Sequence, residues 1–184
     1  MRFSKTLICV VVLLAGCGPS SPPVPPWNGK LTQKIPEPVR TALEVVQEFE
    51  LLSLDPKHRD SDKPSEFLRR KVIGKTLVTD AETRKRILGA LDAGVRPDRD
   101  LAGAACFDPR HAIRVQHAGQ TFYIPICFEC NNVYVFVDDQ AKPLYFSISG
   151  LPEPVFDEVL RTAKVPLAEK AGLEVELVRE PRRN

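Results

Sequence analysis

Three cysteines and one histidine are the residues of this 184-residue chain whose types and spacing could support chemistry. Cys106 and His111 precede a predicted β-hairpin, and Cys127 and Cys130 follow it, which gives the pattern C-x4-H-x15-C-x2-C. Three thiolates and an imidazole are ligands that Zn²⁺ selects in tetrahedral structural sites, and a two-residue gap lets both sulfurs reach one ion. The pattern therefore predicts a zinc site made of Cys106, His111, Cys127 and Cys130.

The expected hairpin supports this ligand set. Its strands are predicted at 111–117 and 121–128, and antiparallel pairing brings the start of the first strand beside the end of the second. Asn131, just after the last cysteine, suits the left-handed turn that a metal-binding knuckle needs. Arg110 is expected beside the site, where its charge would offset the excess negative charge of three thiolates.

Other chemistries would use the same atoms. Five cysteines leave three in the folded body once Cys9 departs with a signal peptide and Cys17 is lipidated, and an odd number means that one thiol is free, intermolecular or metal-bound. An oxidising compartment favours a Cys127–Cys130 disulfide with Cys106 free.

Three further uses of these residues are weaker. A thiol–disulfide oxidoreductase would use the same C-x-x-C, but its reactive thiol lies at a helix N-terminus, whereas the sequence around Cys127 is typical of a strand. Cys106 and His111 could form a nucleophile–base pair, although no third orienting residue stands out. Thiolates also bind copper(I). The other two histidines, His58 and His117, are interpreted as solvated.

The first seventeen residues predict export and lipid attachment. A short basic head is followed by an apolar run of eight residues, Leu7 to Leu14, too short to span a bilayer. The run ends in Leu14-Ala15-Gly16-Cys17, which resembles the lipobox of bacterial lipoproteins. The resemblance implies cleavage before Cys17 and acylation of that residue, and several acyl chains hold a protein stably on a membrane. A plain secretory signal, cut near Gly16 or Gly18, is the alternative.

The segment after Cys17 is expected to act as a tether. Five of the eight residues from Pro19 to Pro26 are prolines, which favours polyproline II structure and offers little to bury. We therefore expect a signal peptide at 1–16, a lipidated, Pro-rich tether at 17–38 and a single domain at 39–184. Gly18 after the cysteine resembles Gram-negative sorting to the outer rather than the inner membrane, with the body facing the periplasm.

Charge and hydropathy limit the partners. The chain has 26 Lys and Arg against 24 Asp and Glu, and removing Arg2 and Lys5 with the signal leaves 24 against 24. A neutral body lacks the positive surface that binds phosphate backbones, so nucleic acid is not an expected partner. The expected partners are the membrane, through the lipid anchor, and an unidentified protein of the envelope.

Apolar periodicity predicts an α+β fold, with helices packed on one face of an antiparallel sheet. Helices are expected at 38–46, from a capping box at 79–82 to about Gly94, and around Phe156 to Ala163; a short helical piece is possible at 166–171. Strands are expected at 49–54, 67–78, 111–117, 121–128, 133–137 and 144–148. Asp55-Pro56 is expected to end the first strand before a loop at 58–64. Pro125 predicts an edge position or a bulge for its strand.

Several motifs resemble an uncharacterised family of bacterial envelope lipoproteins and exported proteins. They are Leu54-Asp55-Pro56, Val72-Ile73-Gly74-Lys75, Cys106-Phe-Asp-Pro-Arg-His111 and Cys127-Phe-Glu-Cys130, within a stretch from Phe49 to about Leu167. The resemblance implies a homologous fold and site and no particular reaction.

The expected function is that of a lipid-anchored envelope protein with structural zinc, acting as a non-enzymatic binding or scaffolding module. Four protein ligands would leave the metal no open position for catalysis. The alternative is a thiol–disulfide redox protein that uses Cys127 and Cys130.

Overall fold

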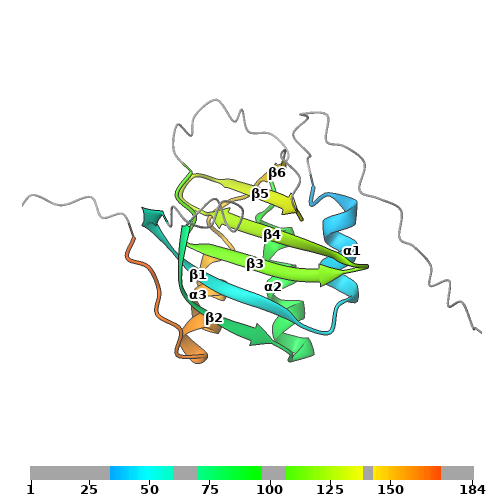
Figure 1. Cartoon of the computed structure of the whole chain (residues 1–184), viewed down its shortest axis with the longest axis horizontal. Helices are drawn as coiled ribbons and strands as arrows, with labels where there is room; N and C mark the ends of the chain where they lie inside the picture. The colour runs from blue at the N-terminus through cyan, green and yellow to red at the C-terminus, as the bar shows by residue number, and fades with distance from the viewer. Residues whose placement is uncertain (1–33, 60–69, 97–106, 139–142, 171–184) are drawn as a thin grey trace, which may run out of the picture.

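The computed structural model describes residues 34–59, 70–96, 107–138 and 143–170, and within them three helices and six strands follow one another along the chain. Their order is α1 (Glu37–Val45), β1 (Phe49–Arg59), β2 (Arg70–Val78), α2 (Ala81–Gly94), β3 (His111–His117), β4 (Gln120–Cys127), β5 (Asn132–Val137), β6 (Leu144–Ser147) and α3 (Glu153–Thr162). The strands form one antiparallel sheet in the order β2-β1-β3-β4-β5-β6 (Figure 1). The predicted α+β fold is confirmed.

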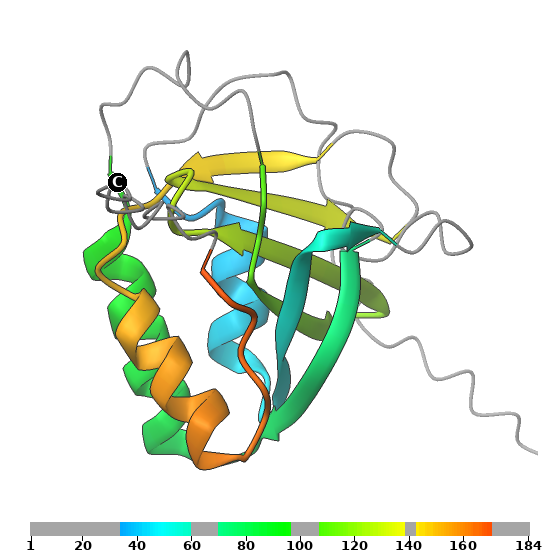
Figure 2. The same cartoon turned by 90° about the vertical axis from the view of Figure 1, so that its left-hand side faces the viewer.

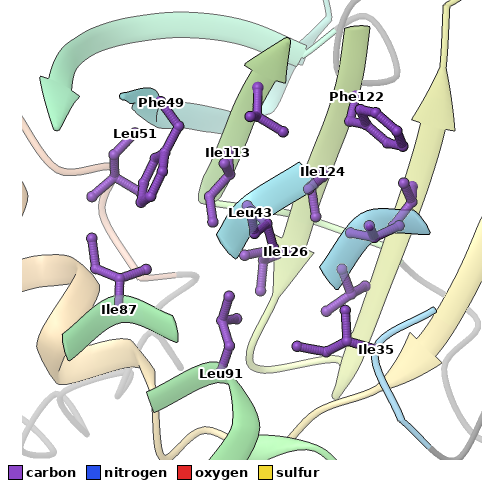
Figure 3. Close-up of a cluster of buried hydrophobic side chains, with 14 of the residues drawn as sticks. Ile35, Leu43, Phe49, Leu51, Ile87, Leu91, Ile113, Phe122, Ile124 and Ile126 are labelled. Carbon is purple, nitrogen blue, oxygen red and sulfur yellow. The ribbon is translucent and has the colours of Figure 1, made fainter. Parts of the chain in front are cut away.

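All three helices pack on the same face of the sheet because each carries an apolar stripe at helical spacing. The buried members of these stripes are Val39, Ala42 and Leu43 on α1, Ile87 and Leu91 on α2, and Phe156 and Leu160 on α3. They meet alternate strand residues such as Leu51, Ile113 and Ile124 in one continuous core (Figure 3). Ile35, ahead of α1, is also buried in this core. None of the helices within the described ranges is long and apolar enough to cross a bilayer.

The β3–β4 hairpin has the register that the alternating pattern predicts. His111 lies opposite Ile126, and the strands are joined by Ala118 (φ 52°) and Gly119 (φ 78°). Two successive residues with positive φ form the kind of tight turn whose twist matches that of the flanking strands. The hairpin thus brings His111 to the end of the sheet where β4 leads into the Cys127–Cys130 turn.

Of the two alternatives predicted from Pro125, an edge position or a bulge, the edge position is wrong. Strand β4 lies inside the sheet, between β3 and β5. Pro125 pairs with Ala112 on one side, but the ladder to β5 passes from Tyr123 directly to Ile126 and omits the two residues between them. The sheet tolerates the missing amide hydrogen because the ladder to β5 is interrupted there.

The prediction that Asp55-Pro56 ends the first strand is also wrong, since β1 continues to Arg59 and so includes the first part of the expected 58–64 loop. The Asp55-Pro56 motif nevertheless disturbs the strand locally. The Asp55 carboxylate accepts hydrogen bonds from the amides of Lys57 (2.9 Å) and His58 (3.2 Å), and the pairing with β2 shifts register between Asp55 and Arg59. The local turn therefore produces an irregularity within the strand.

Helix α2 begins one residue later than its predicted capping box implies. Asp80 is the N-cap, and its carboxylate accepts a hydrogen bond from the amide of Thr83 at 2.7 Å. This places Glu82 at the second helical position, where an acidic side chain favours the positive end of the helix dipole.

The segment after α3 contains no helix at 166–170, contrary to the short helical piece expected there. It runs back along the helix-bearing side beside β1 and β2 (Figure 2). A Cβ on Gly74 would lie 2.8 Å from Val165 Cγ1 and 3.3 Å from Pro166 Cδ. The segment, called here the C-terminal strap (residues 163–170), therefore packs directly against the backbone of β2, which explains why glycine stands at position 74.

Changing Gly74 to alanine is expected to lower the free energy of unfolding by about 1–3 kcal/mol, because the added methyl group must displace the strap. The matched control is Gly89→Ala in α2, where a Cβ meets nothing within 4 Å. That variant should be stabilised by roughly 0.5–1 kcal/mol, since alanine favours a helix more than glycine does. Urea unfolding of both variants tests this packing, and an unaffected Gly74→Ala variant would refute it.

Candidate functional site

His111 begins β3 and points into the core rather than into solvent. It is 2% exposed, and its ring lies against Phe128 and Phe156, with ring centres 5.3 Å and 5.9 Å away. Phe128 comes from the turn after β4, and Phe156 comes from α3. An imidazole in this apolar setting needs polar partners for its two nitrogens.

One of those partners is Asp157 on α3. Its Oδ1 lies 2.8 Å from His111 Nε2, and an ionised carboxylate can only accept, so the ring nitrogen donates. Burial by itself raises the pKa of Asp157, but the hydrogen bond from His111 and the charges of His111, Arg161 and Arg110 lower this pKa more. Asp157 is therefore ionised at neutral pH and ties α3 to β3 through a buried contact.

Glu153, one helical turn before Asp157, belongs to the same set of interacting charged side chains, called here the polar group. Its Oε1 accepts a hydrogen bond from Arg110 Nη2, and its Oε2 lies 3.1 Å from Lys170 Nζ. Arg110 is itself buried, and it also donates to the carbonyl of Ala168 at 3.0 Å and lies 3.9 Å from Glu129. Arg110, expected to neutralise thiolates, thus binds carboxylates and the C-terminal strap.

The polar group holds three carboxylates and three permanent cations. The carboxylates belong to Glu129, Glu153 and Asp157, and the cations are Arg110, Arg161 and Lys170, with Arg161 Nη2 3.0 Å from Asp157 Oδ2. Their formal charges cancel when His111 is neutral. Such compensation is what burial of charge requires.

Two polar atoms next to this group lack hydrogen-bond partners within the described part of the chain: His111 Nδ1 and Ser53 Oγ. Ser53 lies directly opposite His111 in the β1–β3 ladder. The hydrogen bond from Leu54 N to Arg110 O makes this a non-hydrogen-bonded pair, the arrangement in which opposite side chains approach most closely. The unpartnered hydroxyl and the unpartnered ring nitrogen therefore belong to directly opposed residues on the helix-bearing face, and no hydrogen bond joins them.

The Cys127–Cys130 turn closes the site from the other side. The two sulfurs form a disulfide across a turn in which Asn131 has φ 57°, the left-handed conformation expected for an asparagine here. Within the turn, Phe128 packs on His111 and Glu129 approaches Arg110. The disulfide therefore constrains two residues that contact the polar group.

No Cys3His cluster is assembled within the described ranges. His111 pairs with Ile126, and side chains alternate along a strand, so Cys127, the next residue, points to the opposite face of the sheet. The sulfurs of Cys127 and Cys130 bond to each other, and His111 Nε2 faces Asp157.

The other candidate residues lie elsewhere. Cys106 and Cys17 lie outside the described residues, so their expected roles stay predictions. His58 is largely exposed and bonds Asp55, while His117 ends β3 beside the turn.

Glu153 and Asp157 are the site residues that the sequence reasoning missed, although a signal was present. Asp157 sits beside Phe156 and three residues before Leu160, within the apolar stripe of the expected helix. A charged residue in such a stripe is rarely buried without a partner. Its position therefore indicated a polar contact inside the core.

No protein-family model, curated protein or solved structure matches this chain. The resemblance to envelope lipoproteins therefore stays a prediction from the motifs.

Replacing Asp157 by asparagine is expected to cost about 1–3 kcal/mol of unfolding free energy at pH 7, because the buried hydrogen bond loses its charge. The pKa of Asp157 is lowered by folding, so its contribution is present above the ordinary aspartate pKa and is lost as the pH falls through the lower pKa of the folded state. The gap between wild type and variant should thus narrow on acidification below about pH 4.

Glu158→Gln is the matched control for that measurement, since Glu158 is exposed on the same helix and pairs only with the exposed Arg86 among the contacts described. It should change the unfolding free energy by less than about 0.5 kcal/mol. An Asp157→Asn variant as stable as this control would show that the buried contact contributes nothing.

The double change Cys127→Ser and Cys130→Ser removes the disulfide and is expected to lower the free energy of unfolding by about 2 kcal/mol. The effect is modest because a short closed loop restricts the chain entropy of the unfolded state only slightly. Non-reducing peptide mapping should find Cys127 and Cys130 joined in the wild-type chain. Free thiols at both positions in protein isolated without reductant would contradict the disulfide.

Proposed function

We propose that this chain is a lipid-anchored protein of the bacterial cell envelope, facing the periplasm. The support is the basic head and apolar run before Cys17, the lipobox-like Leu14-Ala15-Gly16-Cys17 and the Pro-rich stretch after it. Such a tether, at ~3.1 Å per residue when extended, would hold the body up to roughly 60 Å from the membrane surface. Gly18 favours the outer over the inner membrane.

The body is proposed to act by binding or scaffolding rather than by catalysis. What carries this proposal is the buried His111–Asp157 contact, because the one imidazole in the core is already bonded to a carboxylate and shielded by two phenylalanine rings. A general base must instead reach the proton of a bound substrate. The buried Arg110 is bonded to the half-buried Glu153, so the polar group supports the packing of α3.

A thiol–disulfide redox protein is the second candidate, and the Cys127–Cys130 disulfide favours it. Cys130 is half-buried, whereas Cys127 is 2% exposed at the end of a strand. A redox-active cysteine needs an accessible thiol with a lowered pKa, usually at a helix N-terminus. The strand position of Cys127 therefore supports a structural disulfide more than an exchanging one. The zinc site expected from Cys106, His111, Cys127 and Cys130 would need the disulfide reduced and the Cys127 side chain moved to the face that carries His111.

Changing Cys17 to serine tests the anchor. In a Gram-negative host, the wild-type chain should fractionate with the outer membrane and carry the mass of an acylated Cys17 at its N-terminus. The serine variant should lose that mass and leave the membrane fraction.

Cys106→Ser is the matched control, because it alters another cysteine and should leave fractionation unchanged. Cleavage near Gly16 or Gly18 without acyl mass in the wild type would replace the anchored protein by a secreted one.

A further inference from the structure

We infer that His111, Glu153 and Asp157 form a binding site for one divalent transition metal ion of the zinc class. Each residue offers one ligand atom, and these atoms all lie within 4.8 Å of one another. His111 and Asp157 are buried and Glu153 is half-buried, with side chains 2%, 11% and 13% exposed respectively. The site differs from the Cys3His set in that it uses carboxylate oxygens and shares only His111 with it.

The elements that carry the ligands hold them in a defined arrangement. Glu153 and Asp157 are four residues apart on α3, so their side chains lie on one face of the helix, one turn apart. His111 comes from the first position of β3, against which this face packs. One imidazole nitrogen and two carboxylate oxygens are ligands that Zn²⁺ binds at about 2.0–2.2 Å.

Charge balance permits the exchange of cations that metal binding requires. Lys170 and Arg161, which pair with Glu153 Oε2 and Asp157 Oδ2, have side chains 61% and 64% exposed. Because the charged ends of both side chains already lie largely in solvent, the two cations can withdraw when a metal ion takes over the neutralisation of the carboxylates. One divalent ion then replaces two monovalent ones, and the group formed with Arg110 and Glu129 stays neutral.

The second observation that points to a ligand is that two buried polar atoms, His111 Nδ1 and Ser53 Oγ, have no hydrogen-bond partner among the described residues. Without metal, Nε2 donates to Asp157, and Nδ1 is buried without a partner among the described residues. When Nε2 binds a metal, a neutral ring keeps its proton on Nδ1, and a small rotation of the two opposed side chains would have to bring Ser53 Oγ within reach to accept it. Metal-bound histidines commonly use such a partner on the other nitrogen to fix the tautomer. In a neutral ring the proton moves from Nε2 to Nδ1 without net release, whereas a ring protonated on both nitrogens would release the Nε2 proton to solvent when the metal binds.

Zinc titration of the full mature chain tests this site. The chain is purified in detergent without reductant, stripped with a chelator and titrated with ZnCl₂ against a competing fluorescent chelator. The expected result is one zinc per chain with the disulfide intact. Glu153→Gln should weaken the Kd at least about tenfold, and Ser53→Ala should weaken it to a similar degree through the ring tautomer. Glu158→Gln, on the same helix, should leave the Kd unchanged.

The Cys127→Ser and Cys130→Ser double variant separates this site from the sulfur set and should keep the wild-type Kd. Circular dichroism shows whether each variant folds. If the Glu153→Gln variant does not fold, the zinc affinity of the Ser53→Ala variant is the test of the site. The inference is overturned if the oxidised chain takes up no zinc. It is also overturned if zinc binding survives Glu153→Gln or Ser53→Ala unweakened, or is lost in the double cysteine variant.

Discussion

The buried contact between His111 and Asp157 is the interaction on which the arrangement of this protein depends. It joins the first residue of β3 to the middle of α3 across the core, with 2.8 Å between Nε2 and Oδ1. A polar pair inside a core is favourable only when its members stay together, because separating them leaves a buried charge without compensation. The pair therefore specifies how α3 lies on the sheet more than it adds stability. The surrounding side chains, Phe128 and Phe156 among them, shield it from solvent.

Two chain segments enclose this contact, and each is held by a different kind of bond. The turn after β4 is closed by the Cys127–Cys130 disulfide, which keeps Phe128 against the imidazole. The C-terminal strap packs on Gly74 and is bound through its Ala168 carbonyl by Arg110. The four-residue turn holds an aromatic ring in place, and the proposed export to an oxidising compartment would preserve the disulfide that closes it.

Periodicity predicted most of the fold because it reports which face of each element is buried. The hairpin at His111 and the helix around Phe156 follow directly from it. The edge position suggested by Pro125 is wrong because interruption of one ladder lets an interior strand carry proline. The site was harder to predict, since the sequence places His111 near Cys127 but sheet pairing puts their side chains on opposite faces. The approach of Asp157 to His111 depends on how a distant helix docks, which no local pattern encodes.

The most direct test of the central contact is the imidazole nitrogen spectrum of the metal-free, oxidised chain by NMR. The chain has three histidines, and the exposed His58 provides an internal reference for rapid proton exchange. The structure predicts that His111 carries its proton on Nε2, that this proton exchanges slowly and that Asp157→Asn alters its resonance. A rapidly exchanging His111 proton, or one that does not respond to Asp157→Asn, would contradict the buried pair.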